Sequence, residues 1–164
     1  MLDRNRTIKP EIAMQLTRAA DYAVRVMVHM AGLAPGARIS RTALAASVDC
    51  PEQFLSKVLQ SLTKAGLITS HRGNTGGFEL PASRHRASVM DIIEAVEGPI
   101  CLNLCLNSQN ECALAGSCPA YPIWIQAQNA ITTVLRGASI EQLAQQARLS
   151  RPPDSTGIEE APRG

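Results

Sequence analysis

Residues 40–80 read SRTALAASVDCPEQFLSKVLQSLTKAGLITSHRGNTGGFEL, and this stretch decides the fold class. Ser40 is a favourable N-cap for a first short helix, and Asp49 is the expected cap of a second helix that has Pro51 at its first position. The second helix runs to about Lys64 and combines a buried apolar stripe with an outward polar face. Two short helices joined by a tight turn, the second polar on its outer face, are typical of a helix-turn-helix.

The stretch ends in a predicted β-hairpin. Residues 67–70 and 78–80 favour strands, and the glycine-rich segment 71–77 between them favours a turn. A hairpin directly after a helix-turn-helix is a wing. Arg72 lies at the predicted tip, where a guanidinium group can enter the negative minor groove of DNA.

Helices are expected on both sides of this unit. Apolar residues at helical spacing predict helices over about 15–33, 88–96, 120–136 and 140–146. The sequence therefore predicts a mainly α protein with a small β-hairpin wing, that is, a winged helix-turn-helix followed by a long helix.

Composition narrows the class of protein. Residues 1–90 hold 12 Lys and Arg against 6 Asp and Glu, whereas residues 91–164 hold 4 against 8, a pattern typical of a nucleic-acid-binding part joined to a regulatory part. No apolar run approaches the roughly 18 residues that span a bilayer, so we expect a cytoplasmic protein with no membrane partner. The sequence has no nucleotide-binding glycine fingerprint and no nucleophile-base constellation, so we do not expect an enzyme.

Two kinds of side chain are candidates for contact with double-stranded DNA. Gln53 and Ser56, near the start of the second short helix, can pair with base edges in the major groove, although Gln53 can equally be a plain helix residue. Phosphate contacts position a protein without specifying sequence, and they are expected from Arg38, Arg41, Lys57 and Lys64. The predicted wing adds Arg72, Asn74 and His71, of which His71 is a phosphate contact or a plain surface residue.

Four of the five cysteines form the pattern Cys101-x3-Cys105-x6-Cys112-x5-Cys118. In a reducing cytosol such a cluster indicates a metal or redox centre rather than a disulfide framework. Only the first pair resembles a zinc knuckle, and the ferredoxin pattern C-x2-C-x2-C is absent. The spacing modestly favours an iron-sulfur cluster, with zinc or a thiol redox switch as the alternative. Cys50 lies in the helix-turn-helix turn and is expected to be buried packing.

Several segments together resemble one known family. They are Met14-Gln15-Leu16-Thr17, Asp21-Tyr22-Ala23, Leu62-Thr63-Lys64-Ala65-Gly66-Leu67, Arg72-Gly73-Asn74-Thr75-Gly76-Gly77 and the spaced cysteines. Over about residues 14–143 the chain resembles the Rrf-two family of winged-helix regulators, the iron-sulfur regulators typified by IscR, NsrR and RirA. The resemblance implies a homodimer built on the long helix, a palindromic operator, and a cluster that gates DNA binding in response to nitric oxide, iron or redox state.

The resemblance also implies which residues bind the cluster, with 4Fe-4S favoured and 2Fe-2S as the alternative. Three cysteines hold it in this family; the last two correspond to Cys112 and Cys118, and Cys105 is the expected first ligand. Cys101 is an extra thiol and the alternative ligand.

The fourth ligand varies within the family. In the nitric-oxide-sensing branch it is an aspartate in the first helix, supplied across the dimer, and Asp21 occupies the matching place. The alternatives are that Cys101 takes this role and that Asp21 merely pairs with Arg25 at i, i+4.

The expected organisation follows from the motifs and the resemblance. Residues 1–13 form an N-terminal extension, 14–97 the winged-helix DNA-binding domain, 98–119 the cysteine cluster-binding loop, 120–147 the dimerisation helix with a short C-terminal helix, and 148–164 a disordered tail. Since the family usually begins at the Met-x-Leu-Thr signature, translation is expected to start at Met1 or at Met14.

Overall fold

The computed structural model describes residues 16–73, 76–106, 112–114 and 116–150. In chain order its elements are α1 (Arg18–Ala31), β1 (Arg38–Ile39), α2 (Arg41–Ser47), α3 (Glu52–Lys64), β2 (Thr69–His71), β3 (Gly77–Glu79), the 3-10 turn η1 (Ala82–Arg84), α4 (Val89–Glu97), the 3-10 turn η2 (Leu104–Leu106), α5 (Tyr121–Gly137) and α6 (Ile140–Leu149). The predicted mainly α fold with a small β wing is confirmed. The expected extension 1–13, residues 151–164 of the expected tail, and Asn74 lie outside the described residues.

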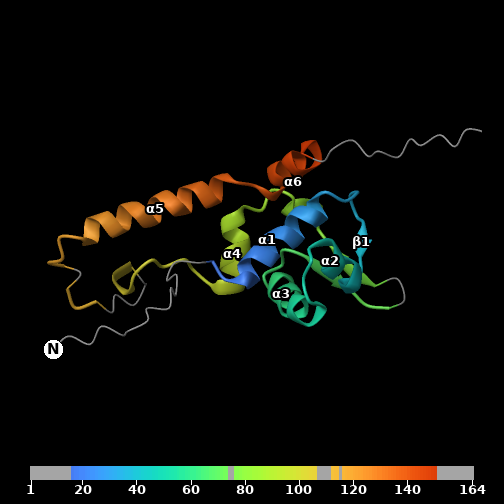
Figure 1. Ribbon diagram of the computed structural model, residues 1–164, viewed down its shortest axis with the longest axis horizontal. Coiled ribbons are helices and arrows are strands. Elements are labelled where there is room, and N and C mark those ends of the chain that lie inside the picture. The colour runs from blue at the N-terminus through green and yellow to red at the C-terminus, as the bar shows by residue number, and fades with distance from the viewer. Residues whose placement is uncertain (1–15, 74–75, 107–111, 115, 151–164) are drawn as a thin grey trace, which may run out of the picture.

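Helix α1 lies at the centre of the core and packs against α3, α4 and α6 (Figure 1). Ala23, Met27 and Met30 recur every three or four residues, which places them on one buried face of the helix. The large, fully buried side chains that form one core with them are aliphatic: Leu44, Leu55, Leu59, Leu62, Ile68, Ile92 and Ile140. The core therefore joins the N-terminal helix, both helices of the helix-turn-helix and the C-terminal helix.

The turn between α2 and α3 differs from the prediction at one residue. Ser40 caps α2 as expected, because its hydroxyl accepts a hydrogen bond from the Ala43 N–H at 3.1 Å. Asp49, however, is not the cap of α3; that position is Pro51. Asp49 has φ 51°, and the Cys50 N–H donates to the Ala45 carbonyl at 3.0 Å. This is the hydrogen bond that closes a helix C-terminus around a left-handed residue, so Asp49 ends α2 instead of starting α3.

The wing is a three-stranded antiparallel sheet in the order β1-β3-β2. The hairpin of β2 and β3 was predicted, whereas β1 was not, because two residues are too few to show strand periodicity. Gly77 permits the pairing of β1 with β3, since a Cβ atom there would lie 2.8 Å from the Ile39 carbonyl oxygen. The base of the wing is thus attached to the segment that leads into α2.

Helix α5 extends away from this body, and none of its residues is buried (Figure 1). Helix α6 returns to the body: Ile140 is 0% exposed, and Arg148 Nη2 donates to the Gly32 carbonyl at 2.6 Å. Because α6 runs to Leu149, the first two residues of the predicted tail are helical instead. Among the described helices, none has the length and apolarity that a bilayer crossing requires.

Glu52 connects the two helices of the helix-turn-helix at their N-termini. Its Oε1 accepts hydrogen bonds from Arg41 Nε at 2.9 Å and from the Thr42 hydroxyl at 2.8 Å. The hydrogen bond from Arg41, followed by that from Thr42, lowers the pKa of Glu52, because both donors favour the charged carboxylate.

We expect Ile140→Ala to destabilise the protein by about 2–5 kcal/mol, because it leaves a cavity between α6 and α1. Leu149→Ala, on the same helix but 87% exposed, is the matched control and should change stability by less than about 0.5 kcal/mol. Urea unfolding of both variants at one protein concentration measures the difference. Equal stability of the two variants would contradict the docking of α6 on the core.

The lowered pKa of Glu52 predicts a pH-dependent contribution to stability. The folded-state pKa lies below the unfolded value, so the contribution is present above the unfolded pKa and is lost as pH falls through the folded pKa. We therefore expect Glu52→Gln to lower Tm at about pH 7, and the difference in Tm from the wild type to shrink as falling pH protonates the Glu52 carboxylate. Thermal unfolding followed by circular dichroism across this pH range measures the difference in Tm. Glu141→Gln, on the exposed face of α6, is the control. A difference in Tm that does not vary with pH contradicts the proposed contribution of the Glu52 carboxylate to stability.

Candidate nucleic-acid interface and cysteine loop

Helices α2 and α3 and the wing enclose a shallow groove of about 600 Å³, which we call the recognition groove. It is lined by Arg41, Ser56, Leu59, Gln60, Thr63, Lys64, Ser70, Arg72 and Phe78. Four of the predicted DNA-contact residues are in this set, namely Arg41, Ser56, Lys64 and Arg72. The groove thus combines three cations with polar side chains on one concave surface. Cations suit contact with the phosphate backbone of DNA, and polar side chains suit contact with base edges.

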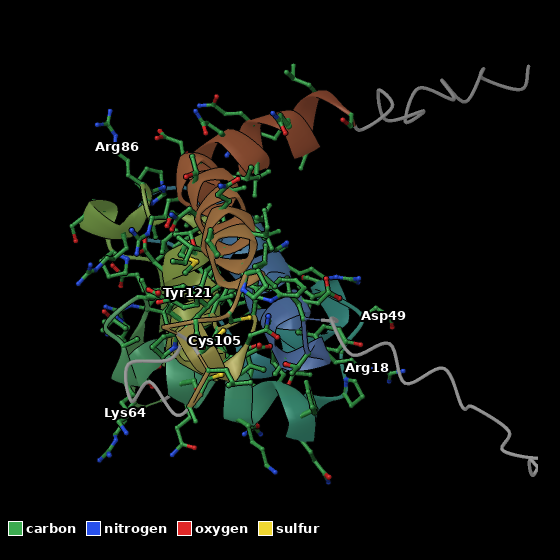
Figure 2. All side chains as sticks on the ribbon, turned by 90° about the vertical axis from the view of Figure 1, so that its left-hand side faces the viewer. Arg18, Asp49, Lys64, Arg86, Cys105 and Tyr121 are labelled. Atoms are coloured by element: carbon green, nitrogen blue, oxygen red, sulfur yellow. The ribbon has the colours of Figure 1, made fainter. Side chains whose placement is uncertain are left out.

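Helix α3 supplies one wall of the groove because its two faces differ. Its buried stripe consists of Leu55, Val58, Leu59 and Leu62, and its exposed side chains include Gln53, Lys57, Gln60 and Lys64. Lys64 points away from the body at the edge of the molecule (Figure 2). Ser56 is half-buried and donates its hydroxyl to the Glu52 carbonyl at 2.9 Å, so this hydroxyl is left with acceptor capacity only.

Two of the predicted phosphate contacts, Arg38 and His71, share the carboxylate of Glu79, although Arg38 remains exposed. Glu79 Oε2 lies 3.4 Å from Arg38 Nε and 2.9 Å from His71 Nε2, although the direction of the imidazole N–H does not make the second contact a hydrogen bond. Arg38 and Glu79 are directly paired across β1 and β3. Sequence reasoning missed this arrangement because it missed β1. The positive charge of the wing is therefore concentrated at Arg72.

Arg41 is also paired, but at the surface. Its Nε contacts Glu52 at 2.9 Å while both side chains remain well exposed. Exposed ion pairs contribute only about 0–1 kcal/mol, so a phosphate group can compete for this guanidinium.

The cysteine loop joins α4 to α5, and none of its four cysteines forms a disulfide. Cys101 is exposed, whereas Cys105, Cys112 and Cys118 are half-buried. The loop is attached to the long helix, since η2 packs against α5 and the Leu102 N–H donates to the Gln128 side chain at 3.2 Å. Figure 2 shows Cys105 in the part of the molecule below Tyr121, the first residue of α5.

The thiols fit an iron-sulfur cluster or zinc by donor type, because thiolate is the ligand that both prefer. Their arrangement is open: in the described part of the chain, no three His, Cys, Asp or Glu side chains lie together in position to hold a metal. Residues 107–111 and 115, which separate the predicted ligands, lie outside the described residues.

Cys50 is separate from these thiols. It is 7% exposed and belongs to the core, as predicted. Burial, and to a lesser extent the charge of Asp49, raises the pKa of the Cys50 thiol, so it is kept protonated and is a poor metal ligand.

Asp21 lies in the first turn of α1 and forms the predicted i, i+4 ion pair with Arg25, with 2.9 Å between Oδ2 and Nη2. Both side chains are about half exposed, so the carboxylate is accessible at the surface. A second contact fixes the start of this helix: the backbone N–H and the hydroxyl of Thr17, the N-cap, both donate to Glu97 Oε1. Since Glu97 ends α4, the first helix is attached to the point from which the cysteine loop departs.

Comparisons with known proteins agree with this geometry. The family model Rrf2, described as an iron-dependent transcriptional regulator, matches residues 16–146. Protein aau3 of Rhizobium meliloti (strain 1021) is 34% identical over 132 residues, which are 79% of this chain and 84% of that protein. These two matches establish the family by sequence.

Two solved structures have a similar fold. CymR (YrzC) of B. subtilis, named as the global cysteine regulator, aligns with a TM-score of 0.65 and 26% identity over 81% of this chain and 98% of that one. The IscR structure from T. potens aligns with a TM-score of 0.62 over 87% of this chain and 95% of that one; at 23% identity this likeness concerns the fold alone. With the family model covering most of the chain and a winged helix-turn-helix at its centre, the chain belongs to the Rrf2 family of transcriptional regulators.

Proposed function

We propose that this protein is a cytoplasmic, homodimeric repressor whose affinity for a palindromic operator is set by an iron-sulfur cluster on the cysteine loop. The observation that carries the DNA-binding part is the recognition groove, where Arg41, Lys64 and Arg72 surround the polar face of α3. Cations at the rim of a groove between a helix and a wing suit phosphate contact on either side of a base-reading helix.

The exposed apolar surface of α5 supports the dimer. Ile123 is 58% exposed, Trp124 41% and Val134 71%, all on a helix with no buried residue. Large apolar side chains on one projecting helix favour burial against a second copy of the same helix. Two α5 helices packed together would place two α3 helices on one duplex, as a palindromic operator requires.

Cys105, Cys112 and Cys118 would hold the cluster, with Cys101 as the alternative first ligand. Their freedom from disulfides and partial exposure support this role. Such a cluster, when bound, supplies a centre that changes on loss of iron, on reaction with nitric oxide or on oxidation. Asp21 is the proposed fourth ligand across the dimer, since its carboxylate is half exposed on α1.

The contact between Thr17 and Glu97 gives a physical route from loop to DNA. It attaches α1 to the end of α4, directly before the loop, and α1 in turn packs against α3. A change in the path of the loop would move the end of α4 and, through Thr17, the helix that supports α3.

The second candidate is a winged-helix regulator with structural zinc or a thiol switch and no cluster. The Cys101-x3-Cys105 spacing favours it, as does the open arrangement of the described thiols. Protein purified without oxygen distinguishes the two candidates, because only the first contains iron and sulfide.

We expect Arg72→Ala to weaken operator binding by about 1–3 kcal/mol and to reduce the salt dependence of the affinity by about one charge. Arg86→Ala removes the same charge from an exposed position that does not line the recognition groove and is the matched control. Fluorescence anisotropy with operator fragments selected from a random library, at several salt concentrations, measures both. Equal affinities of the two variants would remove the wing from DNA binding.

We expect Cys112→Ala and Cys118→Ala each to abolish the cluster, because each variant removes one of the three proposed thiolate ligands. Cys50→Ala is the matched control and should retain iron and sulfide. Native mass spectrometry and iron and sulfide analysis after anaerobic purification measure the outcome, and Asp21→Ala should give a cluster that is lost faster in air. Full occupancy in either loop variant disproves the ligand assignment, and a colourless, zinc-containing wild type rejects the cluster itself.

A further inference from the structure

We propose that Gln60 is a base-reading residue of α3, and that Gln60 and Gln53 together select two A·T base pairs about three steps apart in each operator half-site. The inference rests on the proposed binding of α3 to DNA. It adds a residue and a register that the sequence pattern alone did not identify.

The position of Gln60 in the recognition groove is the first argument. Its exposed side chain lines the groove together with Lys64, one turn further along α3, and with Arg72 of the wing. Gln53 and Lys57 share this exposed face of the helix, since the spacing of four, three and four residues from Gln53 to Lys64 follows the helical repeat. Gln60 therefore lines the groove together with two cations and lies on the stripe of α3 that carries Gln53.

The hydrogen-bonding state of the groove is the second argument. Ser56 and Thr63 donate their hydroxyl protons to the carbonyls four residues earlier, at 2.9 and 2.7 Å. No hydrogen bond joins the amide of Gln60 to another described residue. Within this wall of the groove, Gln60 thus keeps two donors and one acceptor for a ligand.

The chemistry of a primary amide then selects the base. A glutamine can accept from N6 and donate to N7 of adenine at the same time, a pairing that the other three bases do not offer in the major groove. The charged neighbours Lys57 and Lys64 suit phosphates instead, so the amides are left as the sequence-reading groups of the stripe.

The spacing of the two glutamines sets the register. They are seven residues apart, which corresponds to about 10.5 Å along a helix with a rise of about 1.5 Å per residue. Base pairs are stacked about 3.4 Å apart, so the two amides are separated by about three base-pair steps.

Selection from a random DNA library, followed by sequencing, tests the inference on the full-length protein. The variants are Gln60→Ala and Gln53→Ala, and the matched control is Gln145→Ala, an exposed glutamine on α6. Gln60→Ala should lose the preference for A·T at one position per half-site, by about 5- to 100-fold, and keep the other preferences and the salt dependence. Gln53→Ala should lose it at a position about three steps away, and Gln145→Ala should match the wild type.

Gln60→Glu provides a second, gain-of-preference test. A carboxylate accepts from N4 of cytosine, so the preference at the Gln60 position should move from A·T towards C·G. Uniform weakening on all sequences would make Gln60 a phosphate contact, and unchanged preferences would remove it from recognition; either result overturns the inference. If the wild type selects no sequence at all, the proposed function itself fails, and the inference with it.

Discussion

One aliphatic core around α1 is the constraint on which the rest of the structure depends. It is made from α1, from both helices of the helix-turn-helix, from α4 and from α6, so segments from both ends of the described chain bury their side chains in it. Because α3 gives four of its five apolar residues to this core, its outward face is fixed and its polar residues meet the wing in the recognition groove. The proposed DNA-facing surface is therefore a consequence of how the core is packed.

The helices and the hairpin were predictable because each has a strong local signal. The capping hydroxyl of Ser40 predicts the start of α2, and the glycine-rich turn predicts the hairpin of the wing. The wrong or missing predictions concern features that depend on how one element is placed against another. Asp49 has the right side chain for an N-cap, but a left-handed backbone conformation assigns it to the end of α2. Strand β1 is too short to show a pattern, and its pairing with β3 forms only in the folded sheet.

The residue types of the candidate site could be predicted from the sequence, but their positions relative to one another could not. Arg38 and His71 are residue types that commonly contact phosphates. Only the register of the sheet reveals that both lie against Glu79. The sequence predicts an outward polar face for the helix that contains Gln60, but the place of Gln60 in a groove with Arg72 depends on the distance between helix and wing. The fold that CymR and IscR share with this chain likewise identifies no signal or cofactor, because fold alone does not determine function.

The return of α6 to the core gives α5 the properties of a rigid lever. Its C-terminal end leads into α6, whose Ile140 is buried in the core, and its middle is joined to the cysteine loop, because Gln128 accepts a hydrogen bond from the Leu102 N–H. A helix of this length measures about 25 Å, so a rotation of about ten degrees at one end displaces the other by roughly 4 Å. That displacement exceeds the stacking distance of about 3.4 Å between base pairs. In the proposed homodimer, a small rearrangement of the cysteine loop would thus be enough to shift the two α3 helices relative to each other by about one base-pair step.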